Sequence, residues 1–208
     1  MMVRIKFCGI TRFEDARIAA NLGVDALGFI FFKKSPRYIE PENAAQIIKK
    51  LPPFISRVGV FVNEDLSTIL EVAKTTNIDT VQLHGSETPE FCCQIPLPVL
   101  KAFSVKPDMD FSILDNYSCS GFLLDTWNNE MHGGSGKTFN WSIAKSLCNH
   151  YGNIVIAGGL GPSNIQEALD TLHPYGVDIN SGIEIMPGVK NPHKMKDIVR
   201  IIRNWKAV

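Results

Sequence analysis

The stretch Val3-Arg4-Ile5-Lys6-Phe7-Cys8-Gly9-Ile10-Thr11 predicts a strand that ends in a reactive side chain. Apolar residues at positions 3, 5 and 7 alternate with more polar ones, and successive side chains of a strand face opposite sides. We therefore expect Val3, Ile5 and Phe7 to pack under helices, and Lys6 and Cys8 to face the interior of the fold. A lone cysteine is more often a small buried apolar residue than a catalytic one. A catalytic role for Cys8 therefore needs a second ionisable residue elsewhere in the chain.

Seven further short apolar runs follow, separated by amphipathic stretches of helical period. The predicted strands are Val3–Cys8, Asp25–Phe31, Ser56–Val62, Thr80–His84, Pro98–Phe103, Gly121–Asp125, Asn153–Ala157 and Val177–Asn180. The predicted helices are Phe13–Leu22, Glu42–Leu51, Leu66–Thr75, Trp141–Cys148, Pro162–Leu172 and His193–Ile202, with weaker ones over Pro89–Gln94 and Met109–Asn116. Strands that alternate with helices form a parallel sheet, and eight such units close into a single (β/α)8 TIM barrel, here one domain over residues 1–208. A doubly wound open sheet is the alternative.

The composition of the chain argues against several classes of function. The 208 residues are 45% hydrophobic, which is enough for one core, and 21 basic residues balance 21 acidic ones. This balance argues against a nucleic-acid partner or a membrane surface, and the longest apolar stretch, 26–32, is too short to span a bilayer. The five cysteines are odd in number and contain no Cys-x-x-Cys, so we expect no disulfide framework, no zinc site and a reducing, cytoplasmic location.

A second strand candidate also ends in an ionisable side chain. The run Gly121-Phe122-Leu123-Leu124 ends in Asp125. In a parallel barrel the carboxyl ends of all strands meet on one face, so Cys8 and Asp125 would converge there. A thiol and a carboxylate at such a face can exchange protons with one small substrate. The alternative for Asp125 is that its carboxylate closes the strand by accepting backbone amides.

Two glycine clusters predict a phosphate site. Gly158 and Gly159 follow the seventh predicted strand and open a helix, and Ser181 and Gly182 follow the eighth. Glycines let backbone amides approach phosphate oxygens, and the loops after strands seven and eight form the usual phosphate site of barrel enzymes. The alternative is that these residues only form turns. That would explain one cluster, but it does not explain why both lie in the two loops that usually bind phosphate.

Two other predicted loops contain residues of types that bind ligands. The run His132-Gly133-Gly134-Ser135-Gly136-Lys137-Thr138 is similar to a nucleotide-binding P-loop, but its glycine spacing is too short, so we expect a mobile active-site loop instead. The basic segment Lys33-Lys34-Ser35-Pro36-Arg37-Tyr38 follows the second strand, and Arg37 could bind a carboxylate there. The alternative for this segment is an exposed, solubilising loop.

Taken in order, these residues resemble the phosphoribosylanthranilate isomerase family along essentially the whole chain. The matching pieces are Lys6–Thr11, Ser35–Ile39, Val58–Asn63, Val81–Gly85, Leu124–Thr126, Gly133–Phe139, Gly158–Leu160 and Asp178–Glu184. The resemblance implies an Amadori rearrangement of N-(5-phosphoribosyl)anthranilate in tryptophan biosynthesis, without a cofactor or metal and with this phosphosugar as the partner. It assigns Cys8 as general base, Asp125 as general acid, and Arg37 to a place over the anthranilate. His84 and Asp178 carry over as residues that line the pocket.

Two positions depart from the family pattern, and other functions stay open. Asn180 stands where many relatives have Ser or Thr, and Asn191 where they have an acidic residue. A related isomerase of histidine biosynthesis would show aspartate in place of Cys8, and a non-catalytic binding barrel would have no reason to retain Cys8 and Asp125. Family members occur as monomers, dimers and fused domains, so the oligomeric state stays open.

Lys6 is expected inside the barrel, one layer below Cys8, where an unpaired ammonium would cost several kcal/mol. Strands one and eight become neighbours when the barrel closes, so we predict a contact between Lys6 and Asp178. This contact would also favour the Cys8 thiolate. The alternative is that the Lys6 side chain reaches solvent at the bottom of the barrel.

Overall fold

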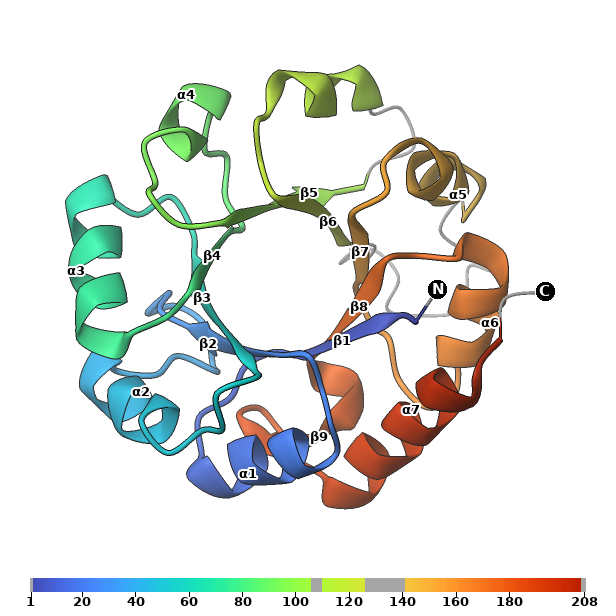
Figure 1. Ribbon diagram of the computed structural model, residues 1–208, viewed down its shortest axis with the longest axis horizontal. Helices are drawn as coiled ribbons and strands as arrows, with labels where there is room; N and C mark the ends of the chain where they lie inside the picture. The colour runs from blue at the N-terminus through green and yellow to red at the C-terminus, as the bar shows by residue number, and fades with distance from the viewer. Residues whose placement is uncertain (1, 106–109, 126–140, 207–208) are drawn as a thin grey trace.

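Eight parallel strands close into a barrel in the computed structural model, which describes residues 2–105, 110–125 and 141–206 (Figure 1). The strands are β1 Arg4–Phe7, β2 Ala26–Ile30, β3 Ser56–Phe61, β4 Thr80–Leu83, β5 Val99–Ser104, β6 Gly121–Asp125, β7 Ile154–Ala157 and β8 Gly176–Ile179. Pairing between β1 and β8 closes the sheet. The predicted (β/α)8 barrel is confirmed over the open sheet, and each predicted strand overlaps the observed one.

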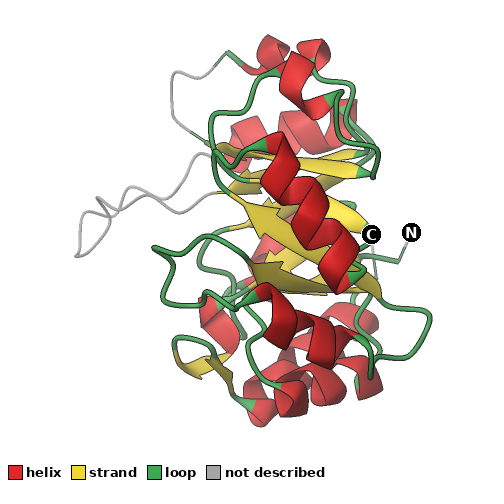
Figure 2. Cartoon of the chain, turned by 90° about the vertical axis from the view of Figure 1, so that its left-hand side faces the viewer, coloured by secondary structure: helices red, strands yellow, loops and turns green. Residues whose placement is uncertain are grey.

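Helices surround the barrel, as the side view in Figure 2 shows. They are α1 Phe13–Asn21, α2 Pro41–Ile48, α3 Leu66–Thr76, α4 Pro89–Cys92, α5 Trp141–His150, α6 Ile165–Leu172 and α7 Pro192–Asn204. A 3-10 helix, η1 (Phe111–Asn116), stands where a weak helix was predicted. The described residues also form another 3-10 helix, η3 (Ser181–Ile183). A hairpin follows it, β9 (Glu184–Met186) with β10 (Val189–Lys190), and the sequence predicted neither element. Within the described residues, no helix is long and apolar enough to cross a membrane.

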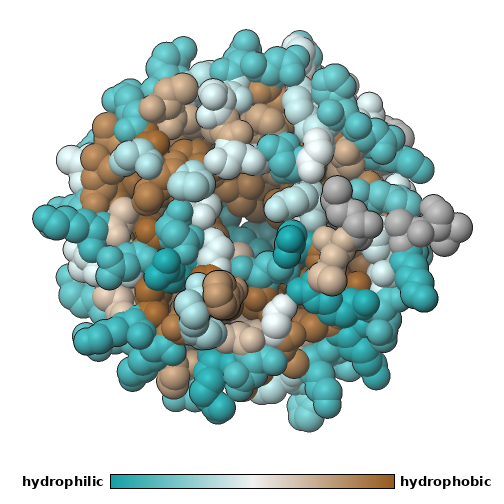
Figure 3. All heavy atoms as spheres, in the orientation of Figure 1, coloured by the Kyte–Doolittle hydropathy of each residue, from teal (hydrophilic) through white to brown (hydrophobic). Residues whose placement is uncertain are grey.

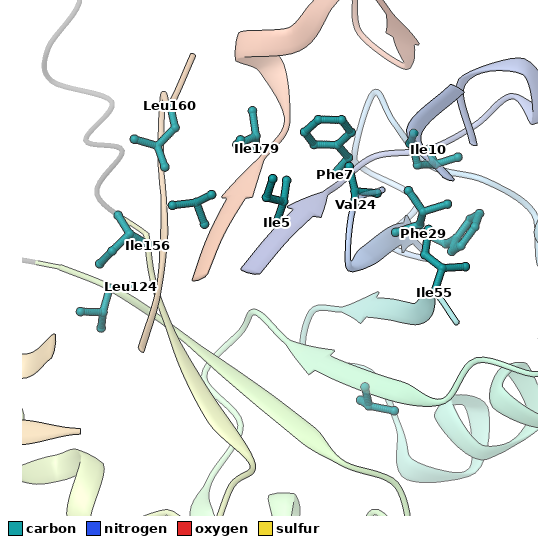
Figure 4. Close-up of a cluster of buried hydrophobic side chains, with 14 of the residues drawn as sticks. Ile5, Phe7, Ile10, Val24, Phe29, Ile55, Leu124, Ile156, Leu160 and Ile179 are labelled. Carbon is teal, nitrogen blue, oxygen red and sulfur yellow. The ribbon is translucent and has the colours of Figure 1, made fainter. Parts of the chain in front are cut away.

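The main apolar core lies between the barrel and the helices. Ile5 and Phe7 of β1 are fully buried in it, together with Ile156 of β7 and Ile179 of β8 (Figure 4). The side chains between them in sequence face the barrel interior, as the period of two requires. The alternation predicted for the first strand is therefore confirmed.

Strand register stacks the inward side chains in layers of four, each layer drawn from alternate strands. From the amino-terminal side upward, the layers are Lys6, Val58, Leu100 and Val155; then Gly28, Gln82, Leu123 and Asp178; then Cys8, Val60, Ala102 and Ala157; and, at the carboxyl ends of the strands, Ile30, His84, Asp125 and Asn180. The upper three layers therefore hold every inward-facing residue that the sequence singled out as a candidate site residue.

The opposite end of the barrel is less filled. The strands begin there with small inward residues such as Ala26, Gly121 and Gly176, and they line a cavity of about 810 Å³. The hollow at the centre of the space-filling view lies over this cavity (Figure 3). The ionisable residues of the upper layers lie toward the other face, which is where barrel enzymes place their chemistry.

Candidate active site

A buried ion pair lies directly beneath Cys8. The Lys6 ammonium donates a 2.7 Å hydrogen bond to Oδ2 of Asp178, and each side chain is only 7% exposed. The pair confirms the contact predicted from the sequence. It depends on Gly28 of the neighbouring strand, because a Cβ there would lie 2.7 Å from Cys8 Sγ and 3.0 Å from Lys6 Nζ. The absence of a side chain at position 28 thus makes room for both the thiol and the ammonium.

Burial decides the ionisation of the thiol. Burial raises the pKa of Cys8, and the Asp178 carboxylate raises it further, whereas the Lys6 and Lys190 ammonium groups lower it. The net pKa is raised. Lys6 favours the thiolate, as expected, but its effect is smaller than that of burial. For Lys6, burial lowers the pKa, but Asp178 and Cys8 outweigh it, so the ammonium stays charged.

His84 and Asp125 meet at the carboxyl ends of β4 and β6. His84 Nε2 lies 3.3 Å from Asp125 Oδ2, as their shared layer requires. On its other side, His84 Nδ1 lies 3.0 Å from Nε2 of Gln82, two residues earlier on the same strand face. Three polar side chains therefore form a chain of contacts from the second layer to the top of the barrel.

Arg37 lies at the rim and is already paired. Its Nε contacts both carboxylate oxygens of Glu184, at 2.9 and 3.0 Å, and Nη2 donates to Oε2 at 2.7 Å. Its side chain is 19% exposed, whereas Lys33 and Lys34 of the same loop are exposed, so the alternative of a solubilising loop does not describe Arg37 itself. The fork leaves Nη1 without a hydrogen bond to the residues that the structure describes.

Glu184 joins Arg37 to a second cation. The Lys190 ammonium is fully buried and donates to Glu184 Oε1 and to Asn180 Oδ1, both at 2.9 Å. Burial would raise the pKa of Glu184, but the bonds from Arg37 and Lys190 outweigh it and lower the pKa. Burial also lowers the pKa of Lys190. The β9–β10 hairpin that carries Glu184 and Lys190 therefore fixes the position of Arg37 from the far end of the chain.

The two glycine loops touch each other above β7 and β8. Gly158 and Gly159 have φ values of +94° and +64°, which side chains rarely tolerate. A Cβ at Gly182 would overlap the Leu160 carbonyl oxygen. Ser181 opens η3, the kind of short extra helix that often completes the phosphate site of a barrel. However, α6 begins at Ile165, so Gly158 and Gly159 lie upstream of its first turn and do not open it as expected.

The two departures from the family pattern have clear local roles. The Asn180 side chain accepts the hydrogen bond from Lys190, which ties the end of β8 to the hairpin. Asn191 caps α7, because its Oδ1 accepts from the backbone amides of His193 and Lys194. An amide oxygen caps a helix about as well as a carboxylate does, so Asn191 preserves the start of α7.

Three residues of this cluster were missed in the sequence: Gln82, Glu184 and Lys190. Gln82 could have been found, because it lies two positions before His84 and therefore faces the same way. The predicted loop over residues 132–138 lies outside the described residues. Among the residues that the structure describes, no group of three or more His, Cys, Asp or Glu side chains could hold a metal ion.

Comparison with known proteins agrees with this geometry. The family model described as N-(5'-phosphoribosyl)anthranilate (PRA) isomerase matches residues 5–201. The N-(5'-phosphoribosyl)anthranilate isomerase of Pelobacter propionicus is 46% identical over 99% of this chain and 98% of that protein. The crystal structure of phosphoribosyl anthranilate isomerase from Thermotoga maritima is 44% identical, covers 98% of this chain and 100% of that one, and superposes with a TM-score of 0.90.

A further solved structure carries a ligand. It is a phosphoribosyl anthranilate isomerase in complex with reduced 1-(o-carboxyphenylamino)-1-deoxyribulose 5-phosphate; it is 40% identical, covers 98% of this chain and 100% of that one, and has a TM-score of 0.88.

The closed barrel, with ionisable side chains gathered at the carboxyl ends of its strands, defines a (β/α)8-barrel enzyme. The extent of the match then identifies the family. The chain belongs to the N-(5'-phosphoribosyl)anthranilate isomerase family, and it is an isomerase.

Proposed function

We propose that this enzyme catalyses the Amadori rearrangement of N-(5-phosphoribosyl)anthranilate to 1-(2-carboxyphenylamino)-1-deoxyribulose 5-phosphate in tryptophan biosynthesis, with Asp125 as general acid and Cys8 as general base. The observation that carries the proposal is the placement of one thiol and one carboxylate in the two uppermost inward layers of the barrel. The ligand of the 40% identical relative is the reduced form of this product, which supports the proposed substrate class.

The reaction needs two proton transfers. Asp125 gives a proton to the ring oxygen of the ribose as its bond to C1′ breaks, which leaves a protonated Schiff base between C1′ and the anthranilate nitrogen. Cys8, as thiolate, then removes the proton on C2′, and the electron pair moves to the nitrogen to form an enol-amine. The enol finally takes a proton at C1′ and loses the proton of its C2′ hydroxyl, which forms the ketone; the proton gained by Cys8 and the one lost by Asp125 balance these two transfers, so both groups return to their starting states. Because burial raises its pKa, the Cys8 thiolate is scarce but a strong base once formed.

The two ends of the substrate are anionic, and the site offers a partner for each. Arg37 would contact the anthranilate carboxylate through Nη1, since Glu184 holds its other edge. The backbone amides around Gly158, Gly159, Ser181 and Gly182 would bind the phosphate. Asp178 and His84 would line the ribose between them. Holding both ends would orient the flexible sugar between Cys8 and Asp125.

Turnover can be followed by the loss of substrate fluorescence. We expect Cys8→Ala and Asp125→Asn each to lower kcat by at least ~10²-fold, the usual contribution of a general acid or base. Cys148→Ala and Asp197→Asn, which change residues on the outer helices α5 and α7, are matched controls. Near-wild-type turnover in either site variant would remove that residue from the mechanism. Tight binding of the substrate without turnover by the unmodified protein would instead indicate a binding barrel.

The proposal extends to the domain organisation, the cofactor requirement and the location of the enzyme. We propose that residues 1–208 work as one domain on this phosphosugar, without a metal or cofactor, in the cytoplasm. All five cysteines are free thiols, as a reducing compartment would maintain them.

A further inference from the structure

We propose that Gln82 is a positioning residue, which holds His84 in the tautomer that presents Nε2–H to Asp125. The inference rests on the proposed role of Asp125 as general acid. Gln82 lies one layer beneath Cys8 and two layers beneath the top of the barrel. It would act on Asp125 only through the imidazole of His84.

His84 contacts Gln82 through one ring nitrogen and Asp125 through the other. Gln82 is 1% exposed and comes from β4, and its Nε2 lies 3.0 Å from His84 Nδ1. His84 Nε2 lies 3.3 Å from Oδ2 of Asp125, on β6. This second distance is long for a hydrogen bond, but catalytic hydrogen bonds often tighten only when substrate is bound.

The direction of the hydrogen bond between Gln82 and His84 follows from the contact that His84 makes with Asp125. After Asp125 has given up its proton, its carboxylate only accepts, so in that state the imidazole nitrogen that faces it must carry hydrogen. In a neutral imidazole the other nitrogen, Nδ1, must then accept. The amide nitrogen of Gln82 is a donor at the required distance, so the amide orientation and the tautomer agree.

This arrangement also selects the oxygen of Asp125 that delivers the proton. While Oδ2 accepts from His84, a proton on Asp125 must reside on Oδ1. If Gln82 instead turned its oxygen toward Nδ1, His84 would carry hydrogen on Nδ1, and Nε2 would compete for the proton of Asp125. The orientation of one buried amide therefore decides whether His84 supports or withholds the acid proton.

The first test is nitrogen NMR of the imidazole of His84, at a pH where it is neutral, with His84→Gln used to assign its signals among the five histidines. We expect the wild-type ring to carry hydrogen on Nε2. Gln82→Met has a similar length but no hydrogen bond, so we expect a mixture of tautomers. Gln82→Glu offers only an acceptor and should shift the ring toward the Nδ1–H form. Gln46→Met, on the exposed face of α2, is the matched control.

The second test is kinetic. We expect Gln82→Met to lower kcat roughly tenfold, a fraction of the ~10²-fold or larger effect of a general acid, and to change KM less than twofold. In a His84→Ala background the same change should have no further effect on kcat, because Gln82 acts through His84.

The outcomes separate the two proposals. A wild-type ring with hydrogen on Nδ1, or an equal loss of kcat with and without His84, would overturn the role of Gln82. The wild-type measurement needs no variant and so does not depend on whether Gln82→Met folds. Full turnover by Asp125→Asn would instead overturn the proposed general acid, and it would leave the tautomer of His84 as measured.

Discussion

Replacing Lys6 by methionine should cost the protein a large part of its stability. The Lys6 ammonium and the Asp178 carboxylate are both 7% exposed and 2.7 Å apart. Because Asp178 Oδ1 is buried without a hydrogen bond to the described residues, Lys6→Met leaves the carboxylate without its charged partner. Breaking one side of a buried ion pair costs about 3–5 kcal/mol. At ~2–4 °C per kcal/mol for a chain of this size, we expect the midpoint of thermal unfolding to fall by roughly 6–20 °C.

Urea unfolding of three variants measures this loss. Lys196→Met, on the exposed face of α7, should stay within about 0.5 kcal/mol of the wild type. The double variant Lys6→Met with Asp178→Leu should recover most of the stability, because an apolar pair can replace a buried ion pair at little cost. If Lys6→Met lost less than about 1 kcal/mol, or if the double variant were the least stable of the three, the ion-pair reasoning would be refuted.

The same variant tests the electrostatics of Cys8. The Lys6 ammonium lowers the pKa of the Cys8 thiol against the larger effect of burial, so Lys6→Met should raise that pKa further. The pH dependence of alkylation, followed by mass spectrometry of the peptide that contains Cys8, should move to higher pH. An unchanged profile would show that Lys6 serves only the structure.

Three shorter predictions concern the rim. Arg37→Ala should chiefly raise KM, because it removes a charged hydrogen bond that contributes ~1.5–3 kcal/mol to substrate binding. A fall in kcat at constant KM would instead show that Arg37 takes part in the chemical step. The pKa of Glu184 is lowered from 4.5, so its contribution to the free energy of unfolding is present above that value and is lost as pH falls through the folded pKa. Glu184→Gln should therefore unfold more easily at pH 7 and lose less further stability on acidification, which acid titrations of both proteins would check. Gly182→Ala would overlap the Leu160 carbonyl, so we expect weaker protection by inorganic phosphate in thermal unfolding; equal protection would argue against the glycine loops as its site.

Period-two alternation made much of the barrel predictable. It separates Ile5 and Phe7, which face the helices, from Lys6 and Cys8, which face inward, and a closed barrel brings the first and last strands together. The contact between Lys6 and Asp178 follows from these two facts and the cost of a lone buried charge. Predictions of this kind need only local pattern and topology.

The net pKa of Cys8 could not be predicted in the same way. Burial of the sulfur and the Asp178 carboxylate both raise this pKa, whereas the Lys6 and Lys190 ammonium groups lower it, and the net direction depends on the balance between them. Only Lys6 and Asp178 are placed by strand register, whereas Lys190 reaches the site through a hairpin that has no clear signal in the sequence. The direction of the pKa shift depends on all of these groups, and the sequence did not predict the contribution of Lys190.

The pairing of Arg37 with Glu184 shows why loop contacts matter for binding as well as for prediction. The two residues are 147 positions apart and lie outside the barrel strands, so neither register nor periodicity relates them. Glu184 itself is held by Lys190, and Lys190 by Asn180 at the end of β8, so Arg37 is anchored through this chain to the barrel. An arginine fixed before the ligand arrives loses less side-chain entropy on binding than a free one. The carboxylate of Glu184 therefore competes for the charge of Arg37 but also holds it in place, and the balance of these effects sets what Arg37 contributes to KM.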